Sequence, residues 1–427
     1  MTGVQVRVDS DGPVPHSVVI VGASHAGVQL ADCLRGEGYT GKITLISYEA
    51  HPPYQRPPLS KAWLKGEMNS DSVLLRAPAY YSDQKIELIT GARVEHLDRT
   101  PEGVELRFSR GGERLVRRFD RLVLATGARA RRPALPGADH PDVLVLRELD
   151  HARSLANRIQ AGPMVVVGGG FVGLEVAATA RALGTEVTVI EAGERLLARA
   201  VGPDTADTLL AAHRAMGTEM VLGAVPTEVR HRDDGTRCVL LDDGREIPAA
   251  TVLLGVGAQA RTELAEQLEL VCDCGIVVDE RCLASDGWTL AVGDCTTTVT
   301  GAGVRYRLES VDNAVEQAGI AAAVLLGRPV PDRPVPWFWS DQGDQKLQIA
   351  GLLTGHTSML VRVDPGRPRR QVALYFADDA LLAAECLNSP ADFVALRSAL
   401  GRGHRPGPEV LSDSSVPLGK LLASVRG

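Results

Sequence analysis

The alternation of apolar and polar residues predicts the same supersecondary unit twice along the chain. The first copy spans residues 16–49 (HSVVIVGASHAGVQLADCLRGEGYTGKITLISYE) and the second spans residues 163–191 (PMVVVGGGFVGLEVAATARALGTEVTVIE). In each copy a short apolar run, typical of a buried strand, leads into a glycine turn, a stretch with helical spacing and a second strand. The pattern therefore predicts two βαβ units and an α/β fold with parallel sheets.

The turn of each unit has the spacing of a dinucleotide-binding fingerprint. The three key positions are Gly168, Gly170 and Gly173 in the second copy and Gly22, Ser24 and Gly27 in the first. The first glycine makes the turn, the second position lets backbone N–H groups approach a pyrophosphate, and the third lets helix and strand pack closely. A lone fingerprint also occurs in turns that bind no phosphate. Two copies in full context predict two bound nucleotides and electron transfer between them.

A glutamate ends each unit, Glu49 in the first and Glu191 in the second. A carboxylate at this place accepts hydrogen bonds from ribose hydroxyls and repels a 2′-phosphate. No arginine directly follows Glu191 to receive such a phosphate, although Arg195 lies four residues further on. For a nicotinamide dinucleotide at the second turn, the sequence thus favours NADH over NADPH.

The composition is that of an ordinary globular protein, with 44% hydrophobic and 23% charged residues among 427. The net charge of −7 argues against nucleic acid as a partner, because such binding needs a basic face. No apolar run reaches the roughly 18 residues of a membrane span, so no membrane partner is expected. Residues 1–15 lack the features of a secretory signal and are predicted to be a polar extension.

The seven cysteines form no C-x-x-C pair, and an odd count without a secretory signal fits the reducing cytoplasm. Cys272 and Cys274, with Cys282 nearby, could be imagined as metal ligands, but the spacing is poor for zinc. We therefore predict a cytoplasmic protein without a metal site.

Three further segments shape the expected organisation. A loop at residues 51–67 (HPPYQRPPLSKAWLKGE) contains prolines that should exclude helix until Ser60. Residues 288–295 (WTLAVGDC) predict a strand that ends in Gly-Asp, and residues 310–327 predict a helix with a glycine stop. The Pro-rich segment at residues 329–337 is the natural start of another domain.

Together these motifs resemble the NADH-dependent ferredoxin reductases of oxygenase systems, flavoproteins with a glutathione-reductase-like fold. The motifs that carry the resemblance are GASHAG, PYQRPPLSK, LATGAR, GGGFVGLE, AVGDC, RLESVDNA and VPWFWSDQ, in this order. The resemblance covers nearly the whole chain after residue 16. It implies two Rossmann-like domains, one for FAD and one for NAD, and an α+β C-terminal domain. The FAD domain would comprise residues 16–133 and 256–331, the NAD domain 134–255 and the C-terminal domain 332–427.

The resemblance also implies which residues line the sites. Those implied to act in catalysis are Lys61, Glu175, Glu309 and Trp339. Those implied to bind a cofactor are Gly22, Ser24, His25, Ala26, Gly27, Glu49, Arg56, Lys61, Val94, Ala125, Thr126, Gly127, Arg131, Gly168, Gly170, Phe171, Val172, Gly173, Glu191, Arg199, Gly257, Gly293, Asp294, Val311 and Trp339.

Specific roles follow from the same resemblance. Lys61 would lie near the reactive edge of the isoalloxazine, where a cation favours the reduced anionic flavin, and Trp339 would cover the ring. Glu175 and Glu309 would flank the nicotinamide. Asp294 would accept a hydrogen bond from the ribitol chain.

Plainer interpretations of these residues remain open. Lys61 alone could be a solvated lysine, and Glu175 could serve a local charge. Glu309 could be the ion-pair partner of Arg305 or Arg307. The residue pair Trp337 and Trp339 could simply be core aromatics, and His25 could be a packing variant of the turn.

The expected reaction is hydride transfer from NADH to FAD, followed by single-electron delivery to a two-iron two-sulfur ferredoxin. That ferredoxin would serve a haem-thiolate monooxygenase or a Rieske dioxygenase. An alternative is an NADH-dependent flavin oxidoreductase that acts on a small molecule or oxygen without ferredoxin. Thiol chemistry is disfavoured, because no cysteine lies between Cys33 and Cys238. An NADH-sensing interaction protein is the third alternative, and we expect a monomer.

Overall fold

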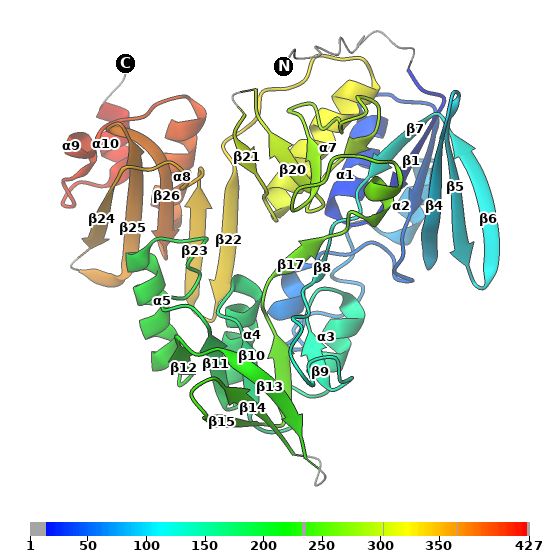
Figure 1. Ribbon diagram of the computed structural model, residues 1–427. Coiled ribbons are helices and arrows are strands. Elements are labelled where there is room, and N and C mark those ends of the chain that lie inside the picture. Colours follow the sequence, from blue (N-terminus) through cyan, green and yellow to red (C-terminus); the bar gives the residue numbers. More distant parts are fainter. Residues whose placement is uncertain (1–13, 233–235, 302, 365, 425–427) are drawn as a thin grey trace, which may run out of the picture. The chain divides into compact units, whose positions relative to one another are not determined.

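The computed structural model describes residues 14–232, 236–301, 303–364 and 366–424. The expected polar extension lies outside the described residues except for Val14 and Pro15. The chain consists of two compact units (Figure 1). Unit 1 comprises Met1–Gln55, Ser70–Arg129 and Gln259–Arg333, and unit 2 comprises Arg56–Asn69, Ala130–Ala258 and Pro334–Gly427. The finer division into FAD, NAD and C-terminal domains stays a prediction.

Unit 1 is built on a five-stranded sheet whose strand order is β19-β7-β1-β2-β3 and whose strands all run parallel. The strands are β1 (Ser17–Val21), β2 (Lys42–Ile46), β3 (Ile86–Ile89), β7 (Arg121–Leu124) and β19 (Leu290–Ala291). Their apolar runs are buried because helices cover parallel sheets. The order reverses at β1, since β2 lies on one side of it and β7 on the other. In sheets of this kind, ligands bind outside the carboxyl ends of the strands at such a switch point.

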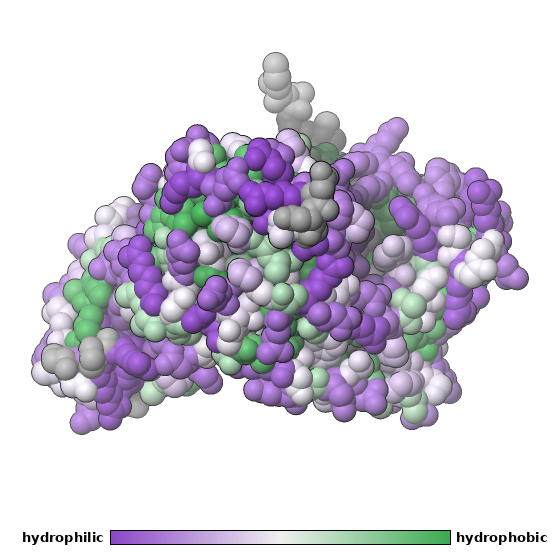
Figure 2. Space-filling model, turned by 90° about the horizontal axis from the view of Figure 1, so that it is seen from below, coloured by the Kyte–Doolittle hydropathy of each residue, from purple (hydrophilic) through white to green (hydrophobic). Residues whose placement is uncertain are grey.

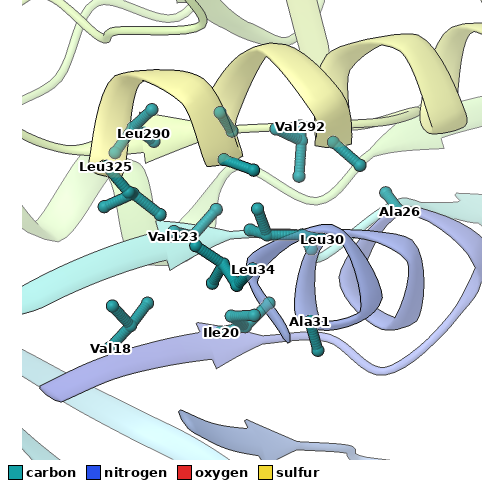
Figure 3. Packing of buried hydrophobic residues seen from close by; sticks show 14 of the residues in the cluster. Val18, Ile20, Ala26, Leu30, Ala31, Leu34, Val123, Leu290, Val292 and Leu325 are labelled. Atoms are coloured by element: carbon teal, nitrogen blue, oxygen red, sulfur yellow. The ribbon is translucent and has the colours of Figure 1, made fainter. Parts of the chain in front are cut away.

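Two helices of unit 1 pack together beside the sheet, α1 (His25–Gly36) and α7 (Val311–Leu325). Figure 3 shows Leu30 and Leu34 of α1 in one apolar cluster with Val123 of β7 and Leu325 of α7. The helix predicted at residues 310–327 is confirmed. The hydroxyl of its N-cap residue Ser310 accepts a hydrogen bond from the backbone N–H of Asn313.

Unit 1 also contains smaller elements. An antiparallel sheet consists of β4 (Ala92–Thr100), β5 (Gly103–Arg110) and β6 (Glu113–Phe119). A second small sheet consists of β18 (Ile276–Val278), β20 (Thr296–Val299) and β21 (Arg305–Tyr306). The short helices are α2 (Pro78–Asp83) and α6 (Glu263–Gln267). The strands β8 (Ala128–Ala130) and β17 (Ala258–Ala260) pair with each other, where the chain passes from one unit to the next.

Unit 2 contains a second parallel sheet, in the order β12-β11-β10-β16-β9. Its strands are β9 (Val143–Val145), β10 (Met164–Val167), β11 (Val187–Glu191), β12 (Glu219–Leu222) and β16 (Thr251–Leu254). Its helices are α3 (Leu149–Ala156), α4 (Phe171–Ala182) and α5 (Pro203–Ala215), and β13 (Pro226–His231), β14 (Arg237–Leu241) and β15 (Glu246–Ala249) form a small antiparallel sheet. The switch point here lies at β10, between β11 and β16. Both predicted βαβ units are therefore confirmed, each with its glycine turn at a switch point.

The C-terminal part of unit 2 is a five-stranded antiparallel sheet with helices. Its elements are β22 (Trp337–Gln342), β23 (Gln345–Ala350), β24 (Ser358–Asp364), β25 (Arg367–Ala377), β26 (Ala380–Leu387), α8 (Pro390–Gly401), α9 (Pro408–Leu411) and α10 (Leu418–Ser424). Buried side chains of β25 and β26 pack against α8 and α10 in one apolar cluster. This architecture agrees with the α+β domain implied by the resemblance.

The proline loop differs from expectation at one point. A short 3-10 helix, η1 (Pro57–Ser60), begins three residues before Ser60, where helix was thought to be excluded. Pro57 and Pro58 occupy its first positions, and a proline there loses nothing, because the first N–H groups of a helix have no partner within it.

In the face shown in Figure 2, hydrophilic residues predominate and hydrophobic ones are scattered among them. Within the described ranges, no helix is long and apolar enough to cross a membrane.

Candidate functional site

The first glycine turn, in unit 1, is as tight as a phosphate-binding turn requires. Gly22 has φ +115°, and a Cβ atom there would lie 2.0 Å from the carbonyl oxygen of Ala125, which follows β7. A Cβ atom on Gly27 would lie 2.0 Å from the carbonyl oxygen of Gly22. Both positions therefore require glycine on packing grounds alone. The turn presents the start of α1 at the switch point between β1 and β7, which fits a pyrophosphate.

Ser24, which replaces the middle glycine of the fingerprint, fits the backbone of the turn without strain. It is the N-cap residue of α1, with φ −108° and ψ −158°, an extended conformation that any residue adopts. His25 and Ala26 open the helix itself. Glu49, beyond β2, accepts a hydrogen bond from the hydroxyl of Tyr54, so its carboxylate is held in place.

The Gly-Asp turn after β19 lies beside this first turn. Gly293 has φ +81°, and a Cβ atom there would come within 3.0 Å of the Cβ of Ala26. Its backbone N–H donates to Oε1 of Gln317 at 2.6 Å, and the Asp294 carbonyl accepts from Arg307 at 2.9 Å. The backbone around Asp294 is thus fixed by one hydrogen bond at the N–H of Gly293 and by another at the carbonyl of Asp294 itself.

Gln317 was not predicted as a site residue. It is fully buried on α7, and besides Gly293 it bonds the hydroxyls of Thr296 and Thr298. The signal was present in the sequence, because Gln317 interrupts the buried apolar face formed by Ala314, Ala318 and Ala321. A polar residue on such a face needs buried partners.

The second glycine turn, in unit 2, repeats the first with one instructive difference. Cβ atoms on Gly168 and Gly173 would lie 2.7 and 2.6 Å from backbone oxygens, so both need glycine for packing. A Cβ atom on Gly170 would lie 3.5 Å from its nearest neighbour, an ordinary contact. The described protein does not itself require glycine at 170, so the open space there fits an approaching ligand.

Gly170→Ala is therefore expected to separate folding from binding. The backbone of Gly170 (φ −83°, ψ 172°) suits alanine, so the melting temperature should stay close to that of the wild type. The added methyl should lower the affinity for NADH about tenfold or more, because it fills space meant for the dinucleotide. Isothermal titration calorimetry and thermal unfolding measure the two effects.

Gly36→Ala is the matched control, because its Cβ atom would meet nothing within 4 Å among the described residues, and NADH binding should not change. Gly173→Ala should instead lose stability. Unchanged NADH affinity in Gly170→Ala would contradict the assignment of this turn.

Glu191 closes the second turn. Its Oε2 accepts the backbone N–H of Gly169 at 2.7 Å, and its Oε1 accepts that of Gly193 at 2.8 Å. Arg195, which left NADPH open, donates instead to the carbonyls of Val201 and Ala198 at 2.6 and 2.9 Å. The guanidinium is thus engaged in its own loop. Among the predicted neighbours, Arg199 is exposed and Val172 is 44% exposed, so both are accessible to a ligand.

A buried ion pair in unit 2 joins two predicted catalytic residues. Nζ of Lys61, which follows η1, lies 2.8 Å from Oε2 of Glu175 on α4. The same oxygen accepts from the Ser60 hydroxyl at 2.6 Å, and Oε1 accepts from the Ser340 hydroxyl at 2.7 Å. Glu175 is only 6% exposed, so each of these donors compensates a charge removed from water. Lys61 is therefore no freely solvated lysine.

Aromatic residues follow both faces of β22. Trp339 stacks on Trp337, with ring centroids 5.2 Å apart. Trp337 also contacts Phe393 and packs against the core, which agrees with the plainer interpretation of that residue. Phe338 lies on the opposite face and contacts Phe171 of the second turn, with ring centroids 4.5 Å apart. The strand thus links the start of α4 to the face that carries Trp339.

Three other predicted residues, Glu309, Thr126 and Arg131, form contacts within the protein. Glu309 forms an ion pair with Arg307 at 2.6 Å, one of the two structural pairings that the sequence left open. Thr126 donates to the Arg261 carbonyl at 2.8 Å, and the Arg131 N–H donates to the Gly257 carbonyl at 3.0 Å.

The structure distributes the predicted site residues over both units. Unit 1 carries Gly22, Ser24, His25, Ala26, Gly27, Glu49, Val94, Ala125, Thr126, Gly127, Gly293, Asp294, Glu309 and Val311. Unit 2 carries Arg56, Lys61, Arg131, Gly168, Gly170, Phe171, Val172, Gly173, Glu175, Glu191, Arg199, Gly257 and Trp339.

The cysteine that follows Asp294 in the sequence is poorly suited to redox chemistry. Cys295 follows Asp294 and is fully buried, and burial raises the pKa of its thiol. A thiol rather than a thiolate is a poor nucleophile. In the described part of the chain, no three potential ligands among His, Cys, Asp and Glu gather as a metal site would need.

Comparison with known proteins places this geometry in a family. Residues 16–318 match the model described as pyridine nucleotide-disulphide oxidoreductase, and residues 337–422 match the reductase C-terminal model. Rhodocoxin reductase of Rhodococcus erythropolis is 39% identical over 412 residues, which cover 95% of this chain and 94% of that protein. Rubredoxin-NAD(+) reductase of Pseudomonas putida is 36% identical, with 88% and 96% covered. The covalent putidaredoxin reductase–putidaredoxin complex has a TM-score of 0.90 at 34% identity, with 96% and 98% covered.

The chain belongs to the pyridine nucleotide-disulphide oxidoreductase family, and within it to the ferredoxin reductases of oxygenase systems. It is an oxidoreductase whose cofactors are FAD and NAD(H). The predicted glutathione-reductase-like fold, enzyme class and cofactors are thereby confirmed. The assignments of individual residues stay predictions.

Proposed function

We propose that this enzyme takes a hydride from NADH onto FAD and delivers the electrons singly to a two-iron two-sulfur ferredoxin. That ferredoxin would feed a haem-thiolate monooxygenase or a Rieske dioxygenase. Transfer to an external redox protein is supported by relatives named for rhodocoxin, putidaredoxin and rubredoxin. The two-iron type of acceptor follows from the resemblance to the ferredoxin reductases. Electrons that leave to an external protein also agree with the lack of any cysteine between Cys33 and Cys238.

The buried pair of Lys61 and Glu175 is the observation that carries the proposal. FAD, when bound, accepts a hydride and releases electrons one at a time. Lys61 would hold its ammonium near the reactive edge of the ring and favour the reduced anion. Glu175 would keep that ammonium in place and lie close to the nicotinamide. Trp339 would cover the ring and exclude water.

The glycine turns would divide the cofactors between them. The turn at Gly22, with Glu49 on the adenosine ribose and Asp294 on the ribitol, would hold FAD as a resident group. The turn at Gly168, with Glu191 on the other ribose, would admit NADH for each turnover. The chain itself would supply orientation and charge in both places.

Three measurements test this function. The purified protein should be yellow and should bleach when NADH is added without oxygen. Cytochrome c reduction by NADH should rise strongly when a two-iron ferredoxin is added. A preference for a one-iron rubredoxin would contradict the proposed acceptor. Rates that no iron protein stimulates would favour direct oxidation of NADH by a small molecule or oxygen.

A further inference from the structure

The Lys61–Glu175 pair is the end of a longer chain of buried hydrogen bonds. Ser340 donates to Oε1 of Glu175 at 2.7 Å, and Nε2 of Gln342 donates to the Ser340 hydroxyl at 3.2 Å. Oε1 of Gln342 lies 2.9 Å from Nε2 of His213 on α5. Ser340, Gln342 and His213 are each fully buried. Three elements of unit 2, α4, β22 and α5, thus share one line of buried polar side chains.

Chemistry orients this line in one direction. The carboxylate of Glu175 can only accept, so the Ser340 hydroxyl proton points to it. The amide nitrogen of Gln342 therefore donates to Ser340, and its amide oxygen must accept from Nε2–H of His213. Nδ1 of His213 has no hydrogen-bond partner among the described residues. In each hydrogen bond of the line, the donor thus lies on the side away from Glu175 and the acceptor on the side toward it.

The members other than the ion pair carry no charge at neutral pH. Burial lowers the pKa of the His213 imidazole, which keeps it neutral, and the hydrogen bond to Gln342 opposes this only in part. Among the described contacts of Glu175, Lys61 is the charged partner, and Ser60 and Ser340 are neutral donors. The line can therefore stabilise the charge of Glu175 without adding a charge of its own.

Strand β22 connects this line to the predicted flavin face. Side chains alternate along a strand, so Phe338, Ser340 and Gln342 share one face and Trp337 and Trp339 share the other. The contacts of Phe338 with α4 and of Gln342 with α5 fix the first face. The same contacts thus hold Trp339 in register with Glu175.

We propose that Ser340, Gln342 and His213 are positioning residues that hold the Glu175 carboxylate against Lys61 and thereby set the ease of flavin reduction. This inference rests on the proposed function, because it assumes that Lys61 acts at the flavin. Loss of a donor leaves more uncompensated negative charge on Glu175. That charge disfavours the reduced anionic flavin, so the flavin midpoint potential becomes more negative.

The functional test uses the FAD-loaded enzyme and stopped-flow reduction by NADH. Ser340→Ala should slow flavin reduction about tenfold at saturating NADH, with a dissociation constant for NADH within about twofold of the wild type. Ser340→Thr should restore the rate, because it returns the hydroxyl. Gln342→Leu should slow reduction less, and the double variant should match Ser340→Ala, since Gln342 acts through Ser340.

Gln371→Leu is the matched control. Gln371 is also a buried glutamine of the C-terminal sheet that bonds α5, through the Thr208 hydroxyl at 2.6 Å, but it lies outside the line. Its removal should leave the flavin potential and the reduction rate unchanged. Nitrogen-15 NMR gives a separate structural test, in which His213 should be the neutral Nε2–H tautomer at pH 7. A charged imidazole or the Nδ1–H tautomer would overturn the proposed direction.

The outcomes distinguish this inference from the proposed function. If Glu175→Gln slows flavin reduction while Ser340→Ala and Gln342→Leu keep the wild-type rate and potential, the positioning line is refuted and the proposed function stands. If Glu175→Gln and a neutral residue at Lys61 also leave reduction unchanged, the catalytic roles of the pair fall, and this inference with them.

Discussion

Replacing Lys61 with methionine is expected to slow the reduction of bound FAD by NADH about 100-fold. Methionine keeps the length of the side chain but removes the ammonium that lies 2.8 Å from Oε2 of Glu175. The charge that would favour the reduced flavin is lost, and a carboxylate only 6% exposed loses its cation. Anaerobic stopped-flow absorbance at saturating NADH measures the rate directly.

The same variant should also be less stable, because breaking a buried pair costs about 3–5 kcal/mol. Lys61→Met combined with Glu175→Gln should recover part of that stability, since the unpaired charge is gone. Lys42→Met is the matched control, because Lys42 pairs with Glu87 at 3.2 Å on the surface with its side chain 53% exposed. A wild-type reduction rate in Lys61→Met would exclude Lys61 from the reaction.

Local patterns in the sequence were sufficient to predict much of the fold. The apolar residues of β1 and β10 are buried, as expected for strands of a parallel sheet that is covered on both faces. The conformation of the glycine turns that follow them is set by steric contacts with nearby backbone. Gly22 and Gly168 need glycine, because a Cβ atom would lie 2.0 Å from a backbone oxygen at Gly22 and 2.7 Å from one at Gly168. Such features depend on neighbours in sequence, so spacing alone reveals them.

The surroundings of the predicted catalytic residues could not be derived in that way. Glu175 bonds Ser60 across 115 positions of sequence and Ser340 across 165, and His213 meets Gln342 across 129. No periodicity encodes contacts of this range, because they arise only when separate elements pack. The resemblance supplied Lys61 and Glu175 by motif, whereas Ser340, Gln342 and His213 became visible only in the structure.

Glu191→Ala is expected to raise the dissociation constant of NADH about 30-fold more than that of NADPH. A hydrogen bond to a charged group contributes about 1.5–3 kcal/mol, and the ribose hydroxyls would lose such an acceptor. A 2′-phosphate has no such bond to lose, and removal of the negative charge relieves its repulsion. The dissociation constant of NADPH divided by that of NADH, both measured by titration, therefore falls even if the turn itself loosens.

Loosening of the turn has its own signature, which separates it from the loss of ribose recognition. Glu191 accepts the N–H groups of Gly169 and Gly193, so its removal frees both and should weaken the two dinucleotides alike. Only the additional loss for NADH reports contact with the ribose. Glu186→Ala is the control, because Glu186 is exposed one residue before β11 and should change neither constant. Arg195 is already engaged by the carbonyls of its own loop, so Glu191 is the residue of this turn that we expect to distinguish the two dinucleotides. Equal weakening of NADH and NADPH by Glu191→Ala would show instead that Glu191 shapes the turn without selecting the cofactor.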